Sequence, residues 1–145
     1  MKNLLRKTIR QIISEAIEMD TVKLTQEDLV EVLKGYLTGA IWTEGETTDK
    51  FTIDDLSEDS QIQAYIDIKE FIKNAGEDAV SEAVEEHGLS HLGMDIWLTR
   101  NSHGAGFFDH SYEHEDELMK AAHDLKGVEL YVGDDNELHF SNSHM

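Results

Sequence analysis

The sequence predicts an α+β fold, in which N-terminal helices pack on a small antiparallel sheet made of two C-terminal β-hairpins (β-β-α-β-β). Two observations predict it. Apolar residues in the first half recur with the 3.6-residue period of helices, and in the second half they alternate with polar residues in short segments joined by turns. A length of 145 residues suits one domain with a single core, and the absence of proline is typical of a helix-rich chain.

The first half contains four predicted helices. The first occupies residues 1–20, where the apolar side chains form one narrow amphipathic stripe. Thr25 and Asp28 have the spacing of a capping box, which opens the second helix. The third begins at Ser57 or Ser60, and it and the short fourth helix each end at a glycine, as helices commonly do.

The second half is predicted to be mostly strand. Met94–Tyr112 is expected to form a hairpin, because apolar and polar residues alternate before its glycine-containing turn. A helix is expected over residues 115–125, and a second hairpin over 128–140 turns at Gly133–Asn136. The expected units are an amphipathic helix (1–20), a single α+β domain (21–142) and a tail remnant (143–145).

Charge is the strongest compositional signal. The chain has 31 Asp and Glu against 12 Lys and Arg, a formal net charge of −19. Such a surface repels nucleic acid and anionic membranes and attracts basic protein surfaces, although acidic side chains also serve solubility alone. No apolar run approaches the roughly 20 residues of a membrane span, and no cysteine is present. We therefore expect a protein of the host cytoplasm that binds neither nucleic acid nor membrane.

Five of the eight histidines lie close together in the sequence. They are His87, His91, His103, His110 and His114. His110 and His114 are four residues apart, a spacing used by zinc sites on helices, but they fall on a predicted strand end and loop, where this spacing has no such meaning. We therefore assign no metal ligands and no cofactor. No nucleophile elbow or triad pattern is present, so no catalytic residue is assigned and an enzyme is not expected.

The turn Arg100–Gly106 is a candidate anion site. Its glycines expose backbone N–H groups, and an arginine beside them could hold a phosphate. A structural ion pair is favoured instead, because a lone arginine in an acidic chain commonly anchors a carboxylate. The partners considered are Asp95, Asp109 and Asp134, and the residues assigned to this anion or ion-pair site are Arg100, Asn101, His103 and Asp109.

A face of the predicted sheet is the candidate partner-binding surface. Strand alternation places Trp97, Tyr131 and His139 on the side away from the helices, and Asp134 and Asp135 lie in the adjoining turn. Aromatic residues dominate the energetics of protein interfaces, which favours protein binding. The alternative is that the N-terminal helix covers these side chains.

Three segments resemble a family of small acidic proteins encoded mainly by tailed bacteriophages and prophages. The segments are Tyr36–Trp42, Asp95–Asp109 and Leu130–Asp135, and the resemblance extends over about residues 24–140. In that family the middle segment usually reads DFWLTRNGHGAGFWDR and the last YVGDDG. This chain departs from the motifs at Ser102, Phe108, His110 and Asn136. The family has no assigned activity, so the resemblance implies a phage origin without a mechanism.

These observations favour a phage accessory protein that binds and inhibits a host nucleic-acid-processing or anti-phage defence protein, with its acidic surface acting as a DNA mimic. A first alternative is a homo-oligomeric interaction or structural phage protein, for example a homodimer formed through the helix at residues 1–20. A second alternative is a nucleotide- or metal-binding protein that uses the Arg100–Gly106 turn.

Overall fold

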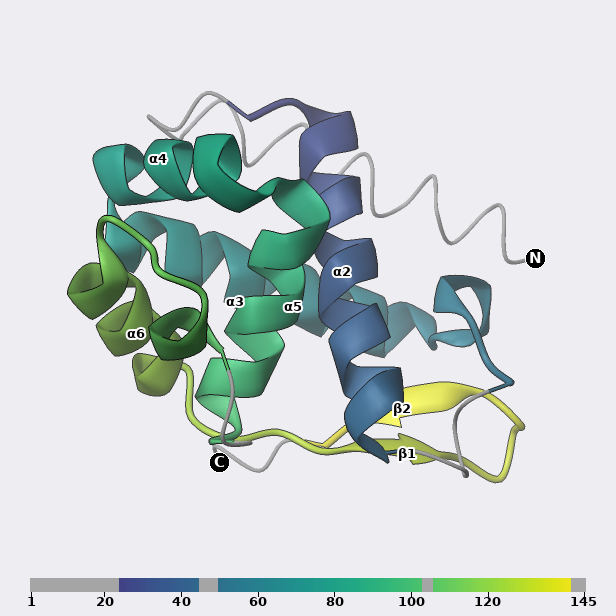
Figure 1. Cartoon of the computed structure of the whole chain (residues 1–145). Helices are drawn as coiled ribbons and strands as arrows, with labels where there is room; N and C mark the ends of the chain where they lie inside the picture. Colours follow the sequence, from purple (N-terminus) through teal and green to yellow (C-terminus); the bar gives the residue numbers. More distant parts are fainter. Residues whose placement is uncertain (1–23, 45–49, 103–105, 142–145) are drawn as a thin grey trace.

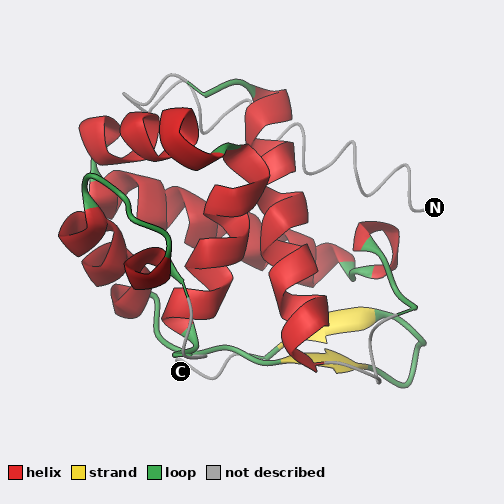
Figure 2. Cartoon of the chain, in the orientation of Figure 1, coloured by secondary structure: helices red, strands yellow, loops and turns green. Residues whose placement is uncertain are grey.

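The computed structural model describes residues 24–44, 50–102 and 106–141. These contain five α-helices, two short 3-10 helices and one two-stranded antiparallel sheet, which confirms the α+β class. The elements are α2 (Gln26–Glu44), η2 (Ile53–Asp55), α3 (Glu58–Ala75), α4 (Glu77–His87), α5 (Leu89–Arg100), η3 (Phe107–Asp109), α6 (Glu115–Asp124), β1 (Leu130–Val132) and β2 (Leu138–Phe140). Helix α5 runs through the middle of the helices, and the strands lie at one end (Figures 1 and 2). The helix predicted at 1–20 and the tail at 143–145 lie outside the described residues.

Local sequence signals set the ends of the first helices. The Thr25 side chain accepts a hydrogen bond from the Asp28 nitrogen and the Asp28 carboxylate accepts one from the Thr25 nitrogen, so the capping box of α2 is present. Ser57 caps α3 by accepting from the backbone nitrogen of Ser60. The next two helices follow Gly76 and Gly88, whose φ angles of 95° and 92° are the left-handed values that glycine adopts without strain.

The predicted first hairpin is wrong. Residues 94–99, expected as a strand, belong to α5, and the segment after the turn contains η3 in place of a returning strand. The reason is burial: eight of the twelve residues of α5 are buried, so this helix has no single apolar stripe. In a short, fully buried segment periodicity does not distinguish a helix from a strand.

Helices α2 and α5 cross in direct backbone contact. A Cβ atom added to Gly93 would overlap the Val32 carbonyl oxygen and lie 2.7 Å from the Tyr36 nitrogen. A Cβ atom on Gly35 would likewise lie 2.6 Å from the Ser90 carbonyl carbon, on the opposite helix. Glycine at both positions therefore allows an approach that no other residue permits.

The second predicted hairpin is present, and it is tied to α3. Leu130 pairs with Phe140, and Tyr131 pairs with His139. The Phe140 nitrogen donates to the Ser60 hydroxyl over 2.9 Å, and the Ser57 nitrogen donates to the Leu138 carbonyl over 2.9 Å. Because an isolated two-stranded hairpin is only marginally stable in water, these bonds fix its position against the helices.

Among the described residues, no helix combines the length and apolar character that crossing a bilayer requires.

Candidate functional site

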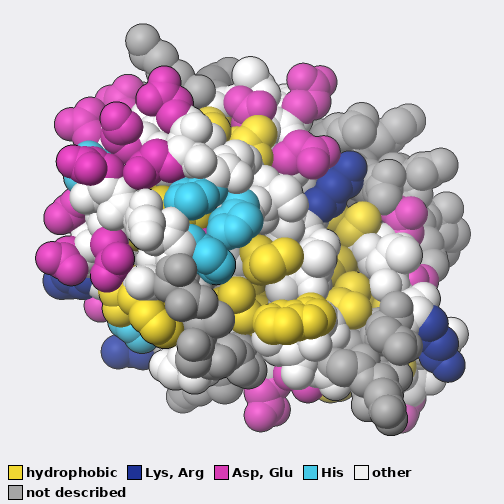
Figure 3. Space-filling view, in the orientation of Figure 1, with side chains coloured by type: hydrophobic (Ala, Val, Ile, Leu, Met, Phe, Trp, Pro, Cys, Tyr) yellow, Lys and Arg dark blue, Asp and Glu magenta, His cyan; other side chains and the backbone are white. Residues whose placement is uncertain are grey.

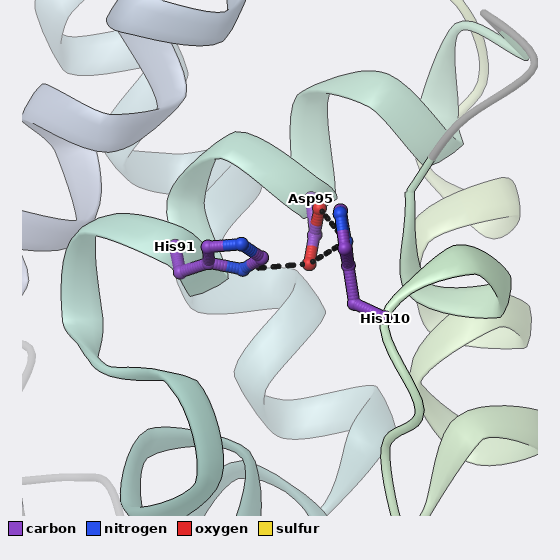
Figure 4. A group of neighbouring side chains, drawn as sticks. All are labelled: His91, Asp95 and His110. Carbon is purple, nitrogen blue, oxygen red and sulfur yellow. Dashed lines mark hydrogen bonds and ion pairs between the residues drawn. The ribbon is translucent and has the colours of Figure 1, made fainter.

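Four ring side chains surround one buried carboxylate where α4, α5 and η3 meet. His87 is the last residue of α4, and Gly88 separates it from α5, which carries His91 and Asp95. These two residues are four apart, so both side chains lie on one face of the helix. His110 caps η3, and Tyr112 follows it. We call these five residues the histidine–carboxylate cluster; Figure 4 shows its His91, Asp95 and His110.

Both imidazoles direct the same ring nitrogen at Asp95, whose side chain is fully buried. The Nδ1 atom of His91 lies 3.1 Å from Asp95 Oδ2, and the Nδ1 atom of His110 lies 3.0 Å from Oδ1. The side chains of His91 and His110 are 35% and 31% exposed, so solvent reaches the cluster from the imidazole side. The cluster is therefore a solvent-accessible site with the buried Asp95 carboxylate at its base.

Tyr112 and His87 complete the cluster. The Tyr112 hydroxyl donates to Asp95 Oδ2 over 2.6 Å, and the His87 ring lies 5.2 Å from the His91 ring between centroids. Burial, followed by the hydrogen bond to Asp95, raises the pKa of Tyr112 far above its ordinary value, which keeps the hydroxyl a donor. Within the described residues, His87 Nε2 is buried without a hydrogen-bond partner, whereas Asp95 Oδ1 is contacted by His110 Nδ1.

The raised tyrosine pKa values predict alkaline unfolding. Burial also raises the pKa of Tyr36 above 10.0, against the opposing effect of the Arg100 guanidinium. When folding raises the pKa of a tyrosine, the group contributes its full stabilisation at pH values below its pKa in the unfolded chain. This stabilisation is lost as the pH rises from that value toward the pKa in the folded protein. We expect the free energy of unfolding to fall above about pH 10, by about 1.4 kcal/mol per pH unit for each of Tyr36 and Tyr112.

Urea denaturation between about pH 9 and about pH 11 measures this slope. Tyr112→Phe is expected to remove one of the two contributions. Tyr131→Phe, which changes a tyrosine that is 49% exposed, is the matched control and should retain the full slope. Equal slopes in the wild type and in Tyr112→Phe would contradict the prediction.

Exposed carboxylates are numerous on the elements that carry the cluster and on the helix that follows it. Helix α4, the segment before α6 and the first turn of α6 contribute seven exposed acidic residues, which we call the acidic face: Glu77, Asp78, Glu85, Glu86, Glu113, Asp116 and Glu117. The Glu86 carboxylate accepts a hydrogen bond from the Glu113 nitrogen over 3.1 Å, which holds the two segments together. Figure 3 shows histidines between acidic side chains on one side and hydrophobic ones on the other.

The structure brings together four of the five predicted partner-binding residues. Tyr131 is 49% exposed and stacks on His139, with ring centroids 5.4 Å apart. His139 Nε2 lies 3.0 Å from Asp135 Oδ1, and this hydrogen bond lowers the pKa of the Asp135 carboxyl. Asp134 is exposed in the same turn. This surface of the second hairpin is therefore available to a partner.

Trp97 does not belong to that surface. Its placement on an exposed sheet face is corrected by the structure, because it lies on α5 with 0% exposure. Its indole Nε1 donates to the Thr43 hydroxyl over 2.9 Å, and its ring packs edge-on against Tyr36. Trp97 is therefore a core residue.

Arg100 is buried in an ion pair with Asp67. Its Nη1 donates to Asp67 Oδ2 and to the Tyr36 hydroxyl, each over 2.8 Å. Nε and Nη2 donate to the backbone carbonyls of Lys126 and Leu125. The expected partners Asp95, Asp109 and Asp134 do not include Asp67. Because every guanidinium nitrogen is already engaged by protein, Arg100 does not face solvent as a phosphate ligand would.

The other residues of the predicted anion site have separate roles or locations. Asn101 accepts a hydrogen bond from the Val128 nitrogen over 2.8 Å and donates to the Trp97 carbonyl, so it fixes the segment that enters β1. His103 lies outside the described residues. Asp109 belongs to η3, and its side chain is not described.

Sequence reasoning did not single out Asp67 or Tyr112, and it named His91 and Asp95 without connecting them. Asp67 and Tyr112 carry no local signal. The pair His91 and Asp95 does carry one, since a spacing of four residues places two ligands on one helix face. That signal was hidden because Asp95 lies in the segment predicted as a strand.

Comparison of the chain with protein-family models, with curated proteins and with solved structures gives no match. The resemblance to the phage family therefore stays a prediction. A fold of this kind supports many activities, so the function depends on the side chains of the site.

Proposed function

We propose that this protein binds a basic surface of a host protein in the host cytoplasm, through the acidic face, and inhibits it. The target class is a nucleic-acid-processing or anti-phage defence protein, whose basic groove the carboxylates occupy in place of DNA. The observation that supports this is the segregation of charge. Between Lys73 and Lys120 the sequence has no lysine and one arginine, and that arginine is buried in the ion pair with Asp67.

The acidic face has the electrostatics that such an interaction requires. Its seven exposed carboxylates lie between Lys73 and Lys120, where the one arginine is buried, so their potentials largely add. Glu117 also contacts His114 over 2.9 Å, and Lys120 follows on the same helix. A surface of one sign accelerates encounter with an oppositely charged groove and disfavours partners of the same sign, DNA included. At physiological salt, dissolved ions screen the electrostatic potential of this surface over about 8 Å. Binding to a basic partner therefore weakens as salt is added.

An exposed aromatic side chain lies close in sequence to the cluster. Phe108 of η3 is 48% exposed, two residues before His110 of the cluster. Exposed aromatic residues at an interface contribute more to affinity than charged residues at its rim. Phe108 thus offers an apolar contact, and the carboxylates of the acidic face offer selectivity for a basic partner.

Charge reversal tests this proposal. We expect Glu85→Lys combined with Glu113→Lys to abolish capture of a basic, DNA-binding protein from a bacterial lysate, with the immobilised full chain as bait. The matched control is Glu70→Lys combined with Glu129→Lys, which makes the same change in net charge at exposed positions outside the acidic face. Capture by the control variant should equal capture by the wild type.

The captured protein is then assayed for DNA binding with and without the chain. We expect the chain to compete with DNA, and its affinity to fall by roughly tenfold or more between about 50 mM and about 300 mM NaCl. An affinity that does not change with salt would refute the proposal. So would equal loss of capture in both double variants, because location on the acidic face would then not matter.

A further inference from the structure

We propose that His91, Asp95 and His110 form a binding site for a divalent first-row transition-metal ion, with Zn²⁺ as the reference ion. This inference is independent of the proposed partner, because it rests on the side chains of the cluster and not on the acidic face. Each residue offers one ligand atom, and the three atoms lie within 4.8 Å of one another.

The spacing of the ligand atoms suits a metal ion. Ligand bonds from imidazole nitrogen and carboxylate oxygen to zinc are about 2.0–2.2 Å long, so neighbouring ligand atoms are separated by about 3.0–3.5 Å. The two nitrogen–oxygen distances in the cluster are 3.1 and 3.0 Å. Figure 4 shows both imidazoles directed at the carboxylate from opposite sides. The ion would lie between the two partly exposed imidazoles and Asp95.

The ligand set selects the class of ion. Two imidazoles and one carboxylate favour zinc, iron, cobalt or nickel, whereas magnesium and calcium prefer oxygen ligands alone. Three protein ligands leave at least one coordination position to water, as in catalytic rather than closed structural sites. The one-third exposure of both imidazoles gives solvent a path to that position.

The buried groups of the cluster supply a second reason for a cation. A buried carboxylate is costly unless its charge is balanced, and Asp95 is 0% exposed. Arg100 lies on the same helix but pairs with Asp67. Within the part of the chain that the structure describes, the neighbouring His87 Nε2 is buried without a hydrogen-bond partner, and the one polar contact given for Asp95 Oδ1 is His110 Nδ1. A metal ion held by Asp95 and the two imidazoles would compensate this buried charge.

Tyr112 acts as an outer partner of the site. Its hydroxyl donates to Asp95 Oδ2 over 2.6 Å and so orients the carboxylate toward the two imidazoles. Such outer hydrogen bonds typically contribute 10- to 100-fold to metal affinity, a magnitude of about 1–3 kcal/mol. Tyr112 is therefore a positioning residue and not a ligand.

A second group of potential ligands provides an internal comparison. Asp135, Glu137 and His139 also place three ligand atoms within 4.8 Å, on the second hairpin. That group has one nitrogen ligand and an exposed Asp135, and exposed acidic groups hold transition ions weakly. The proposal assigns the ion to His91, Asp95 and His110, so variants of the two groups must behave differently.

Metal titration of the tag-free full chain tests the site. Zn²⁺ binding is measured by calorimetry, and Co²⁺ binding by its visible absorption, which reports ligand geometry. We expect one ion per chain. His110→Ala should weaken affinity by at least about 100-fold, and Tyr112→Phe by about tenfold. His110→Arg, which keeps a cation beside Asp95 but has no acceptor nitrogen, should fold normally and lose the ion.

His114→Ala and His139→Ala are the matched controls. His114 is 34% exposed and pairs with Glu117, so it resembles His110 in exposure and in having a carboxylate partner. Both controls should bind the ion as the wild type does. The proposal is overturned if folded wild-type chain binds neither ion below about 100 μM, about 5.5 kcal/mol of binding free energy. It is also overturned if His139→Ala loses the ion, or if folded His110→Arg retains it.

Discussion

Replacing Arg100 with methionine is expected to lower the free energy of unfolding by about 3–5 kcal/mol. Methionine fills a similar volume but donates no hydrogen bond. Asp67, Tyr36 and the carbonyls of Leu125 and Lys126 would then lose their shared donor. A buried group left without its partner costs far more than an exposed one, because water does not replace the lost hydrogen bond.

Urea denaturation followed by circular dichroism measures this effect. Arg100→Lys should recover only part of the loss, because one ammonium group does not reach acceptors on three sides as the planar guanidinium does. Lys120→Met is the matched control, since it breaks an exposed pair with Asp124 and is expected to cost less than about 1 kcal/mol. A loss below about 1 kcal/mol in Arg100→Met would show that the ion pair is dispensable.

Gly93→Ala is expected to destabilise the fold by about 3 kcal/mol or more. In an exposed helix this change would stabilise by about 1 kcal/mol, because alanine has the higher helix propensity. In α5 the added methyl group meets the backbone of α2 at Val32 and Tyr36, which cannot move aside as a side chain would. The sign of the effect therefore reports directly on the contact between the helices.

Gly127→Ala is the control for this experiment. A methyl group there would meet only the Asn101 side-chain oxygen, at an ordinary contact distance of 3.5 Å. We expect its stability to stay within about 0.5 kcal/mol of the wild type, as for most surface substitutions. If Gly93→Ala is as stable as the wild type or more stable, α2 and α5 do not cross as described.

Elements with local signals were predictable from the sequence. The α2 capping box needs only Thr25 and Asp28, and Ser57 caps α3 through a residue three positions away. The second hairpin was predicted from its turn, where Asn136 has a φ angle of 62°, a conformation that asparagine tolerates. In each case the residues that fix the structure are neighbours in the chain.

Helix α5 was not predictable in the same way. Other elements pack on several sides of α5, so its apolar residues do not follow the helical period. Ile96 and Trp97, for example, are adjacent in sequence and both are fully buried. The ion pair of Arg100 was not predictable for the same reason. The partner of Arg100 lies 33 residues earlier in the chain, and nothing local distinguishes Asp67 from the other acidic residues.

The close crossing of α2 and α5 also indicates how diverged relatives of this chain can be found. Any homologue with this crossing must keep the smallest side chain at the positions of Gly35 and Gly93, whatever replaces its surface charges. A sequence search that weights those two glycines and their spacing more than overall identity should therefore still detect homologues whose exposed acidic residues have been substituted.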